Sequence, residues 1–145
     1  MCHLDRDGVK IHYEVHGKGD PVLLSHGYSA TAKMWEKQVE ALAPRYRVVT
    51  WDMRGHGLSD SPGDLGRYSE ELTVGDMTAL LDAIGARTAV IAGLSLGGYM
   101  SLAFNARVPE RVRQDQPRDA RAAARVPGLE APDDRGRHRL DARWR

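Results

Sequence analysis

The chain has 145 residues, of which 41% are apolar and 28% charged, and its formal net charge is +1. That length fits one domain of ordinary size, and a charge this close to zero argues against a nucleic-acid partner. The charge is unevenly divided. Residues 1–112 carry twelve basic against fourteen acidic side chains, whereas residues 113–145 carry nine arginines against six acidic side chains.

Two features bear on the cellular compartment. Cys2 is the only cysteine, so an intramolecular disulfide is excluded. The sequence has no run of about 18 apolar residues, as a membrane-spanning helix needs, and its first residues lack the apolar core of a signal peptide. We therefore expect a cytoplasmic protein without a membrane partner, and we assign no cofactor or metal site.

The first predicted elements are two strands. Residues 9–16 alternate apolar and polar side chains, which is typical of a half-buried strand at the edge of a sheet. Residues 22–25 form a short apolar run that predicts a second strand, and His26 and Gly27 follow it. We interpret His26 as structural, because an imidazole directly after a buried strand has little freedom. The backbone N–H of Tyr28 in the same loop is the candidate functional group.

A helix, a strand and a polar loop come next. Apolar side chains at helical spacing predict a helix over residues 31–43, with Thr31 as its N-cap. Its buried face is expected to hold Trp35, Val39 and Leu42. Residues 47–52 predict a third strand, and a Gly-rich loop follows at 53–62. The polar groups here resemble a catalytic cluster, but we interpret them as a structural loop whose hydrogen bonds are satisfied internally. They are Asp52, Arg54, His56 and Ser59.

The next pair of elements is again a helix and a strand. A helix is predicted over residues 69–85, with Gly85 as its C-terminal stop. Its buried face is expected to hold Met77, Leu80, Leu81 and Ile84. Residues 88–92 are short, apolar and partly β-branched, which predicts a strand buried on both faces of a sheet.

The residues after this strand carry the chemistry. Gly93, Ser95 and Gly97 form the pattern Gly-x-Ser-x-Gly, and a further helix follows until Pro109. The stripe of this helix that is expected to face the core consists of Tyr99, Leu102, Ala103 and Ala106. A serine hydroxyl is a poor nucleophile unless it is exposed, held and given a base. A sharp strand-to-helix turn would expose Ser95, and the backbone N–H of Leu96 would then stabilise an oxyanion.

Alternating strands and helices predict an α/β fold with a mostly parallel sheet and helices on both faces. Four segments, in this order, resemble the α/β-hydrolase superfamily over roughly residues 8–112. They are His26-Gly27, Asp52-Met-Arg-Gly-His-Gly-Leu-Ser59, Gly93-Leu-Ser-Leu-Gly-Gly98 and Val108-Pro-Glu-Arg-Val112.

This resemblance implies an α/β-hydrolase fold and a small-molecule substrate with an ester or related acyl group. Ser95 would be the nucleophile, and the backbone N–H groups of Leu96 and Tyr28 would form the oxyanion hole. A serine at this turn argues against the dehalogenase and epoxide-hydrolase branches, which have an aspartate there. In the family a further strand and then later strands follow, and these deliver the acid and the histidine of the triad.

The chain departs from that pattern after Val112. Residues 113–145 consist largely of Arg, Ala, Asp, Pro and Gly and show no strand pattern. We interpret this tail as disordered and as the product of a shifted reading frame or an equivalent truncation. The alternative is a natural basic disordered tail for an acidic partner. The order of a Ser–Asp–His triad is kept by Asp133, Asp134 and His138, but no strand is predicted to fix their geometry.

Three functional hypotheses follow. The first is a serine hydrolase of the α/β-hydrolase fold, truncated after the helix that follows Ser95. The second is a catalytically inactive truncated hydrolase, and the third is an interaction module that uses the basic tail. Without a positioned acid and histidine, the chain alone is expected to be inactive. Without later strands, residues 88–92 would form an unpaired apolar edge and the chain would self-associate there.

Overall fold

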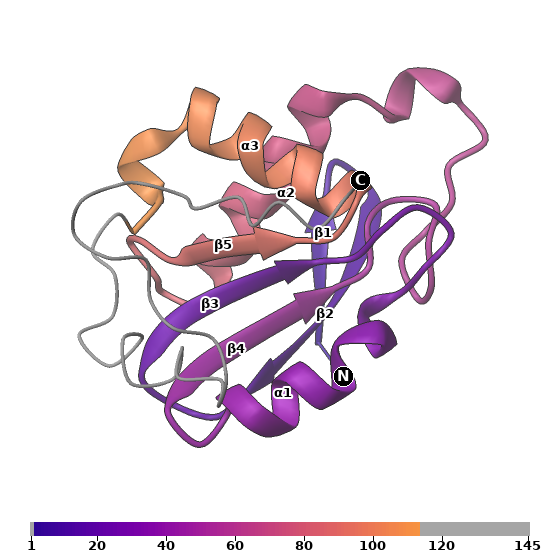
Figure 1. The fold of residues 1–145 in the computed structure, drawn as a ribbon. Coiled ribbons are helices and arrows are strands. Elements are labelled where there is room, and N and C mark those ends of the chain that lie inside the picture. Colours follow the sequence, from indigo (N-terminus) through magenta and orange to yellow (C-terminus); the bar gives the residue numbers. More distant parts are fainter. Residues whose placement is uncertain (1, 114–145) are drawn as a thin grey trace, which may run out of the picture. The chain divides into compact units, whose positions relative to one another are not determined.

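The computed structural model describes residues 2–113 (Figure 1). The expectations for the tail, including those for Asp133, Asp134 and His138, lie outside the described residues. Five strands form one sheet in the order β1-β2-β4-β3-β5. Their bounds are Cys2–Arg6 for β1, Val9–His16 for β2, Asp20–Ser25 for β3, Tyr46–Trp51 for β4 and Val90–Gly93 for β5. The α-helices are α1 (Glu36–Leu42), α2 (Glu70–Ala83) and α3 (Leu96–Arg107), and short 3-10 turns are η1 (Ala32–Trp35), η2 (Leu65–Arg67) and η3 (Pro109–Arg111).

The sheet is mixed. Strand β3 lies parallel to β4 and to β5, with Leu23 opposite Val49 on one side and Ile91 on the other. Strands β1, β2 and β4 pair in antiparallel fashion. The α/β fold class predicted from the sequence is confirmed. The prediction that residues 9–16 form the edge strand is wrong, because β1 pairs with residues 9–13 and is itself the edge strand.

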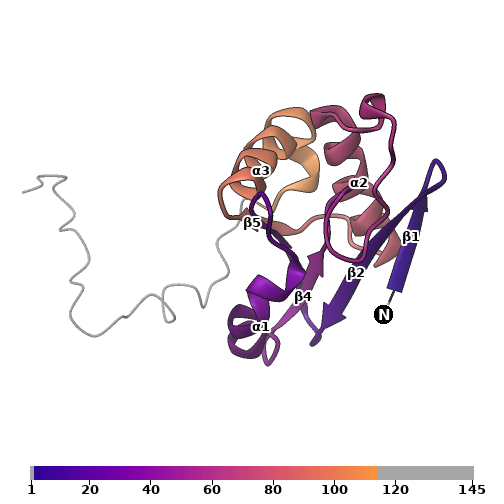
Figure 2. The same ribbon diagram turned by 90° about the vertical axis from the view of Figure 1, so that its right-hand side faces the viewer.

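Helices cover both faces of the sheet, as predicted (Figures 1 and 2). One face packs against α1 through Val22, Leu24 and Val48, which meet Trp35, Val39 and Leu42. The other face packs against α2 and α3 and forms the larger core. Its largest buried side chains are Ile11, Leu23, Trp51, Met77, Leu80, Leu81 and Phe104. Each such side chain removed from water stabilises the fold by about 1.5–3 kcal/mol. No helix within residues 2–113 has the length and apolarity to cross a bilayer.

The start of the first helical segment differs from the prediction. The chain first forms the 3-10 turn η1 and becomes α-helical only at Glu36, and the Thr31 side chain makes no capping hydrogen bond. The carboxylate of Asp52 takes that role, because its Oδ1 accepts the Ala32 N–H at 2.7 Å. A residue from the end of β4 therefore holds the segment that leads into α1.

Helix α2 agrees with its sequence signals. The Ser69 hydroxyl accepts the N–H of Leu72 at 3.1 Å, which is an N-cap bond. Gly85 follows the helix with a φ of 65°, a backbone conformation that glycine adopts without strain. The predicted buried face is confirmed, with Met77, Leu80 and Leu81 fully buried and Ile84 packed beside them.

The rotation of α3 differs from the prediction. Its core-facing residues are Gly97, Met100 and Phe104, with Ala103 packed beside them, whereas Tyr99 and Leu102 are 55% and 72% exposed. Of the four residues predicted to face the core, Ala103 alone does so, because Ala106 is also exposed. The Tyr99 hydroxyl instead donates to Glu70 of α2 at 2.5 Å, so the two helices are joined at their outer surface.

Strand β5 is half-buried along its length, so the prediction that it is buried on both faces is wrong. The reason lies at its outer edge. There Ala89 pairs with residues 111–113, accepting the Arg113 N–H at 2.8 Å and donating its own N–H to Arg111 O at 3.0 Å. Beyond Ala89, no other strand within residues 2–113 pairs with this edge.

Candidate active site

Ser95 stands on the turn between β5 and α3. Its backbone has φ 52° and ψ −114°, a combination that costs a non-glycine residue about 1–3 kcal/mol and that clusters at functional sites. The side chain is exposed. Its hydroxyl makes no capping hydrogen bond, and no other partner for it occurs among the described residues. The turn therefore presents a free hydroxyl at the carboxyl end of the sheet.

Two glycines allow this turn. A methyl group on Gly97 would lie 2.1 Å from the carbonyl oxygen of Ser25, at the end of β3. A methyl group on Gly93 would lie 2.3 Å from the carbonyl carbon of Gly97. The first turn of α3 is thus pressed against the ends of β3 and β5. The Leu94 N–H also donates to Ser25 O, at 3.2 Å, so the turn is fixed to the sheet.

The two expected oxyanion donors flank Ser95. Leu96 is the first residue of α3, so its N–H has no acceptor within the helix and lies at the positive end of the helix dipole. On the other side, a methyl group on Gly27 would lie 3.6 Å from Cβ of Ser95. Tyr28, the next residue, therefore adjoins the nucleophile position. The fold therefore brings the loop that carries Tyr28 next to the turn that carries Ser95 and Leu96, although the two are far apart in the sequence.

The structural role expected for His26 is confirmed. The imidazole is fully buried, its Nδ1 lies 2.8 Å from Gly27 O, and its Nε2 accepts the Met53 N–H at 2.9 Å. This arrangement requires the neutral ring with the proton on Nδ1. Burial lowers the pKa of His26 from its ordinary value, and the nearby His56 lowers it further. His26 therefore fixes the loop that carries Tyr28 and has no nitrogen left for Ser95.

The Gly-rich loop after β4 is also structural, as expected. The carboxylate of Asp52 accepts N–H bonds from Ala32 and from Leu58, at 2.7 and 2.9 Å. The Ser59 hydroxyl donates to Asp52 O at 2.6 Å and accepts the His12 N–H at 2.8 Å. Both side chains are buried and their polar atoms are satisfied.

Arg54 is held by a partner that sequence reasoning missed. It makes a buried, two-pronged ion pair with Asp76 in the middle of α2. Asp76 interrupts an otherwise apolar stretch around Val74 and Met77, and that acidic residue within an apolar helix face was the available signal.

No general base contacts Ser95 within the described part of the chain. Two candidate rings, those of His26 and His56, pack against each other with centroids 4.9 Å apart. His56 directs its Nδ1 toward Arg54 O, at 3.1 Å, and its ring meets that of Tyr28 edge to face. Residues 2–113 also contain no group of three or more His, Cys, Asp or Glu side chains arranged to hold a metal ion.

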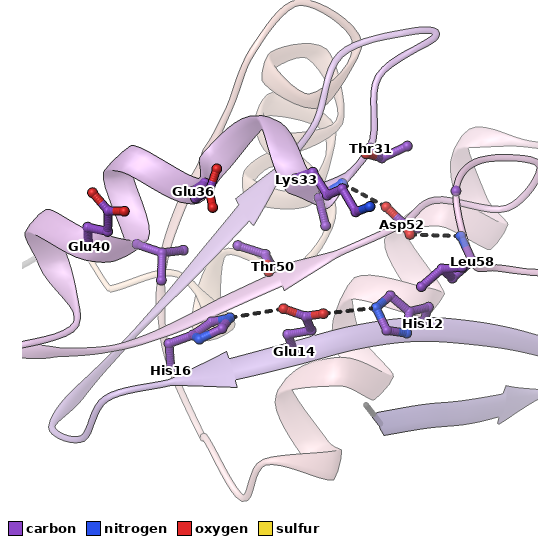
Figure 3. A pocket seen from close by; sticks show the side chains of 13 residues that line it. His12, Glu14, His16, Thr31, Lys33, Glu36, Glu40, Thr50, Asp52 and Leu58 are labelled. Carbon is purple, nitrogen blue, oxygen red and sulfur yellow. Dashed lines mark hydrogen bonds and ion pairs between the residues drawn. The ribbon is translucent and has the colours of Figure 1, made fainter.

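A second feature lies away from Ser95. Figure 3 shows a cavity of about 720 Å³ between α1 and β2. Its wall on β2 carries His12, Glu14 and His16, which alternate along the strand and therefore share one face. The sequence pattern His-x-Glu-x-His was the available signal, because side chains two residues apart on a strand share one face.

An α/β sheet with an exposed serine on a glycine-flanked strand-to-helix turn defines the class of α/β hydrolases with a nucleophile elbow. The comparison with protein families agrees, since the model described as alpha/beta hydrolase fold matches residues 20–114. The chain belongs to this family.

Its relatives in sequence include hydrolases of several kinds. RutD of Azorhizobium caulinodans, whose name assigns it a carbamate hydrolase activity, is 41% identical over 103 residues. That alignment covers 71% of this chain and 38% of RutD. An epoxide hydrolase of Caballeronia sordidicola is 38% identical over 92 residues, covering 63% of this chain and 28% of the relative. The chain therefore spans well under half the length of these relatives.

Solved structures show the same fold. A mutant of the Vigna radiata epoxide hydrolase superposes with a TM-score of 0.74 and 29% identity, covering 77% of this chain and 35% of that protein. The enol-lactonase of Burkholderia xenovorans superposes with a TM-score of 0.72 and 32% identity, covering 77% of this chain and 44% of that one.

Proposed function

We propose that this chain carries the nucleophile and the oxyanion hole of a serine hydrolase acting on a small ester or a related acyl compound. The observation that carries the proposal is Ser95 itself, exposed on a strained turn at the start of α3 with Gly27 packed against it. Two of the relatives support it, because RutD is named as a carbamate hydrolase and the Burkholderia xenovorans protein as an enol-lactonase. Both names describe compounds in which a nucleophile attacks an acyl carbon.

The epoxide hydrolases among the relatives mark the alternative substrate class. The family resemblance implies an aspartate at the elbow of that branch, because a carboxylate attacks the epoxide carbon without first losing a proton. This chain has a serine there. A serine hydroxyl needs a base to take its proton and an oxyanion hole to receive the negative charge, which is the requirement of acyl chemistry.

The chemistry assigns one role to each group. The Ser95 Oγ attacks the acyl carbon, the N–H groups of Leu96 and Tyr28 hold the oxygen as it becomes negative, and the leaving group departs. The proton of Ser95 must pass to a base, and residues 2–113 place none in contact with it. Loss of triad members costs several powers of ten and leaves about 10³–10⁴-fold catalysis over water, so we propose that, without an added base, the chain turns over an ester no faster than Ser95→Ala does.

Acylation in the presence of an external base tests this proposal. The full chain is incubated with p-nitrophenyl acetate and imidazole, and its intact mass is measured over time. We expect one acetyl group on Ser95, formed faster as imidazole increases, and none in Ser95→Ala. Styrene oxide under the same conditions should leave the mass unchanged. Equal acetylation of Ser95→Ala, or alkylation of Ser95 by the epoxide, would overturn the assignment.

We also propose that the chain self-associates through the outer edge of β5. Ala89 directs both its N–H and its C=O toward residues 111–113. Backbone groups of a strand alternate between its two sides, so Ile91 and Gly93 point the same way. An edge with unpaired, uncharged backbone groups is a template for pairing with another strand.

A further inference from the structure

We propose that the cavity between α1 and β2 binds an organic cation with primary ammonium groups, of the aliphatic diamine or polyamine class. The cavity has a volume of about 720 Å³, and Ser95 is not among its lining residues. It is therefore separate from the acyl site. Nine of its thirteen lining residues have charged or polar side chains, among them Glu14, Glu36, Thr50 and Asp52.

The cavity exists because α1 covers only part of its face of the sheet. The apolar side chains of α1 pack on β3 and β4, through Val22, Leu24 and Val48. The same face of β2 carries His12, Glu14 and His16, and within residues 2–113 no helix packs over them (Figure 3). A polar strand face beside a short helix thus leaves a groove floored by β4.

The floor of this groove carries a polar side chain that makes no hydrogen bond within residues 2–113. Thr50 of β4 is only 2% exposed, and it lies directly opposite Glu14 in the register, so both side chains share the cavity face. No hydrogen bond of the Thr50 hydroxyl to another group occurs among the described residues. A ligand with a hydrogen-bonding group at this point gives the hydroxyl a partner.

The charges select a cation. Four carboxylates line the cavity, from Glu14, Glu36, Glu40 and Asp52, against one ammonium from Lys33. An anionic ligand would be repelled by this excess of negative charge, whereas an ammonium group is a donor of three hydrogen bonds to carboxylates and hydroxyls.

The carboxylates are not equally available. Asp52 is only 2% exposed and both its oxygens already accept backbone N–H groups, and Glu40 pairs with Lys37 at 3.0 Å. The Glu14 carboxylate has a histidine beside each oxygen, but its side chain is 41% exposed and its remaining lone pairs are open to a ligand. Glu36 makes no ion pair or hydrogen bond within the described residues. Glu36 on α1 and Glu14 on β2 face the groove from opposite walls (Figure 3). We therefore place one ammonium group between them, with the Thr50 hydroxyl below.

The two histidines hold Glu14 in position. The Nε2 of His12 lies 3.4 Å from one oxygen of Glu14, and the Nε2 of His16 lies 3.2 Å from the other. His12 is 2% exposed, so it is a fixed part of the wall. Because the two imidazoles bind opposite oxygens of one carboxylate, they are separated by it and do not converge on a single point. This separation favours an ammonium ligand over a metal ion.

Calorimetric titration of the full chain with spermidine at low ionic strength tests the proposal. We expect one saturable site for spermidine and weaker binding of putrescine at that site. We expect no binding of 1,4-butanediol, which has the chain length of putrescine but no charge. Glu36→Gln and Glu14→Gln should each weaken binding about tenfold. Thr50→Val, which keeps the side-chain shape, should weaken it several-fold. Glu110→Gln is the matched control outside the cavity and should have no effect.

Nuclear magnetic resonance of the histidine rings locates the ligand. Spermidine should shift the ring signals of His12 and His16 and leave that of His26 unchanged. Ser95→Ala should bind spermidine as the wild type does, so this result is independent of the proposed hydrolase. Absence of saturable binding would overturn the proposal. So would equal weakening by Glu110→Gln, which would show diffuse charge attraction, or displacement of spermidine by zinc at equimolar concentration, which would show a metal site.

Discussion

The guanidinium of Arg54 makes two hydrogen bonds to the carboxylate of Asp76, from Nε to Oδ2 at 2.7 Å and from Nη2 to Oδ1 at 2.8 Å. Both side chains are buried, at 4% and 1% exposure. The hydrogen bond to Asp76 raises the pKa of Arg54 further, so the arginine stays charged. This pair joins the loop after β4 to the centre of α2.

We expect Asp76→Asn to lower the free energy of unfolding by about 3–5 kcal/mol, because it leaves the buried charge of Arg54 without a counter-charge. Urea denaturation followed by tryptophan fluorescence measures the change. The double variant Arg54→Met, Asp76→Leu fills the same space without charge and should be more stable than Asp76→Asn. If the double variant is less stable than Asp76→Asn, the ion pair stabilises the fold by more than the free energy that burying its two charges costs.

The backbone of Ser95 leads to a second prediction. We expect Ser95→Gly to raise the free energy of unfolding by about 1 kcal/mol, because glycine accepts a φ of 52° and a ψ of −114° without strain and part of that gain is lost to chain entropy. Ser95→Ala keeps the strain and should unfold like the wild type. Thermal unfolding of the three proteins distinguishes these outcomes. Equal destabilisation by both substitutions would contradict a strained turn.

Sequence patterns predict an element correctly where its signals are local. Helix α2 has capping residues at both ends and one apolar face, so Ser69, Gly85 and Met77 were placed correctly. Helix α3 has apolar residues on all sides, so periodicity cannot select its buried face. Its rotation is set by the contact of Gly97 with Ser25, a tertiary contact that the sequence does not display.

In the candidate site, too, local features could be predicted from the sequence and tertiary contacts could not. The nucleophile turn was found because its chemistry requires a local pattern around Ser95. The partner of Arg54 and the groove beside Glu14 depend on which elements become neighbours in space. Thr31 illustrates the same limit, since it looks like a helix cap, yet Asp52, twenty-one residues further along the chain, binds the first N–H of that segment.

Glycine at position 97 is expected to be essential for folding. Gly97→Ala would place a methyl group 2.1 Å from Ser25 O, a backbone atom that cannot move without shifting β3. We expect a loss of about 3 kcal/mol or more in the free energy of unfolding. Gly63→Ala is the matched control, because a methyl group there meets nothing within 4 Å. If the two variants unfold at the same urea concentration, the turn is not pressed against the sheet as described.

Stability should fall in mild acid because of His26. Burial lowers the pKa of this imidazole in the folded chain, so the unfolded chain binds its proton at a higher pH. Stability is therefore complete above the ordinary value of 6.5 and is lost as the pH falls below it toward the folded pKa. The variant His26→Gln cannot take up this proton. Its melting temperature should start lower and change less between pH 7.5 and about pH 5 than that of the wild type. Parallel slopes for the two proteins would show that other groups cause the acid sensitivity.

The last prediction concerns the outer edge of β5. Val90 pairs with Val22 of β3 on its inner side, no strand within residues 2–113 pairs with its outer side, and its side chain is half-buried against the α1 face. We expect Val90→Lys to shift the chain toward monomer, because a charge on an open edge opposes strand pairing.

Sedimentation velocity at several protein concentrations measures this shift. The control is Val15→Lys, the same substitution at a 39%-exposed residue of β2 that pairs with Val49 of β4 and lies far from β5 in the strand order. Circular dichroism of both variants should match the wild type, since a loss of folded structure would itself cause association. If the wild type sediments as a single monomeric species at all concentrations, the edge of β5 does not mediate self-association. If both variants reduce association equally, net charge rather than the edge is responsible.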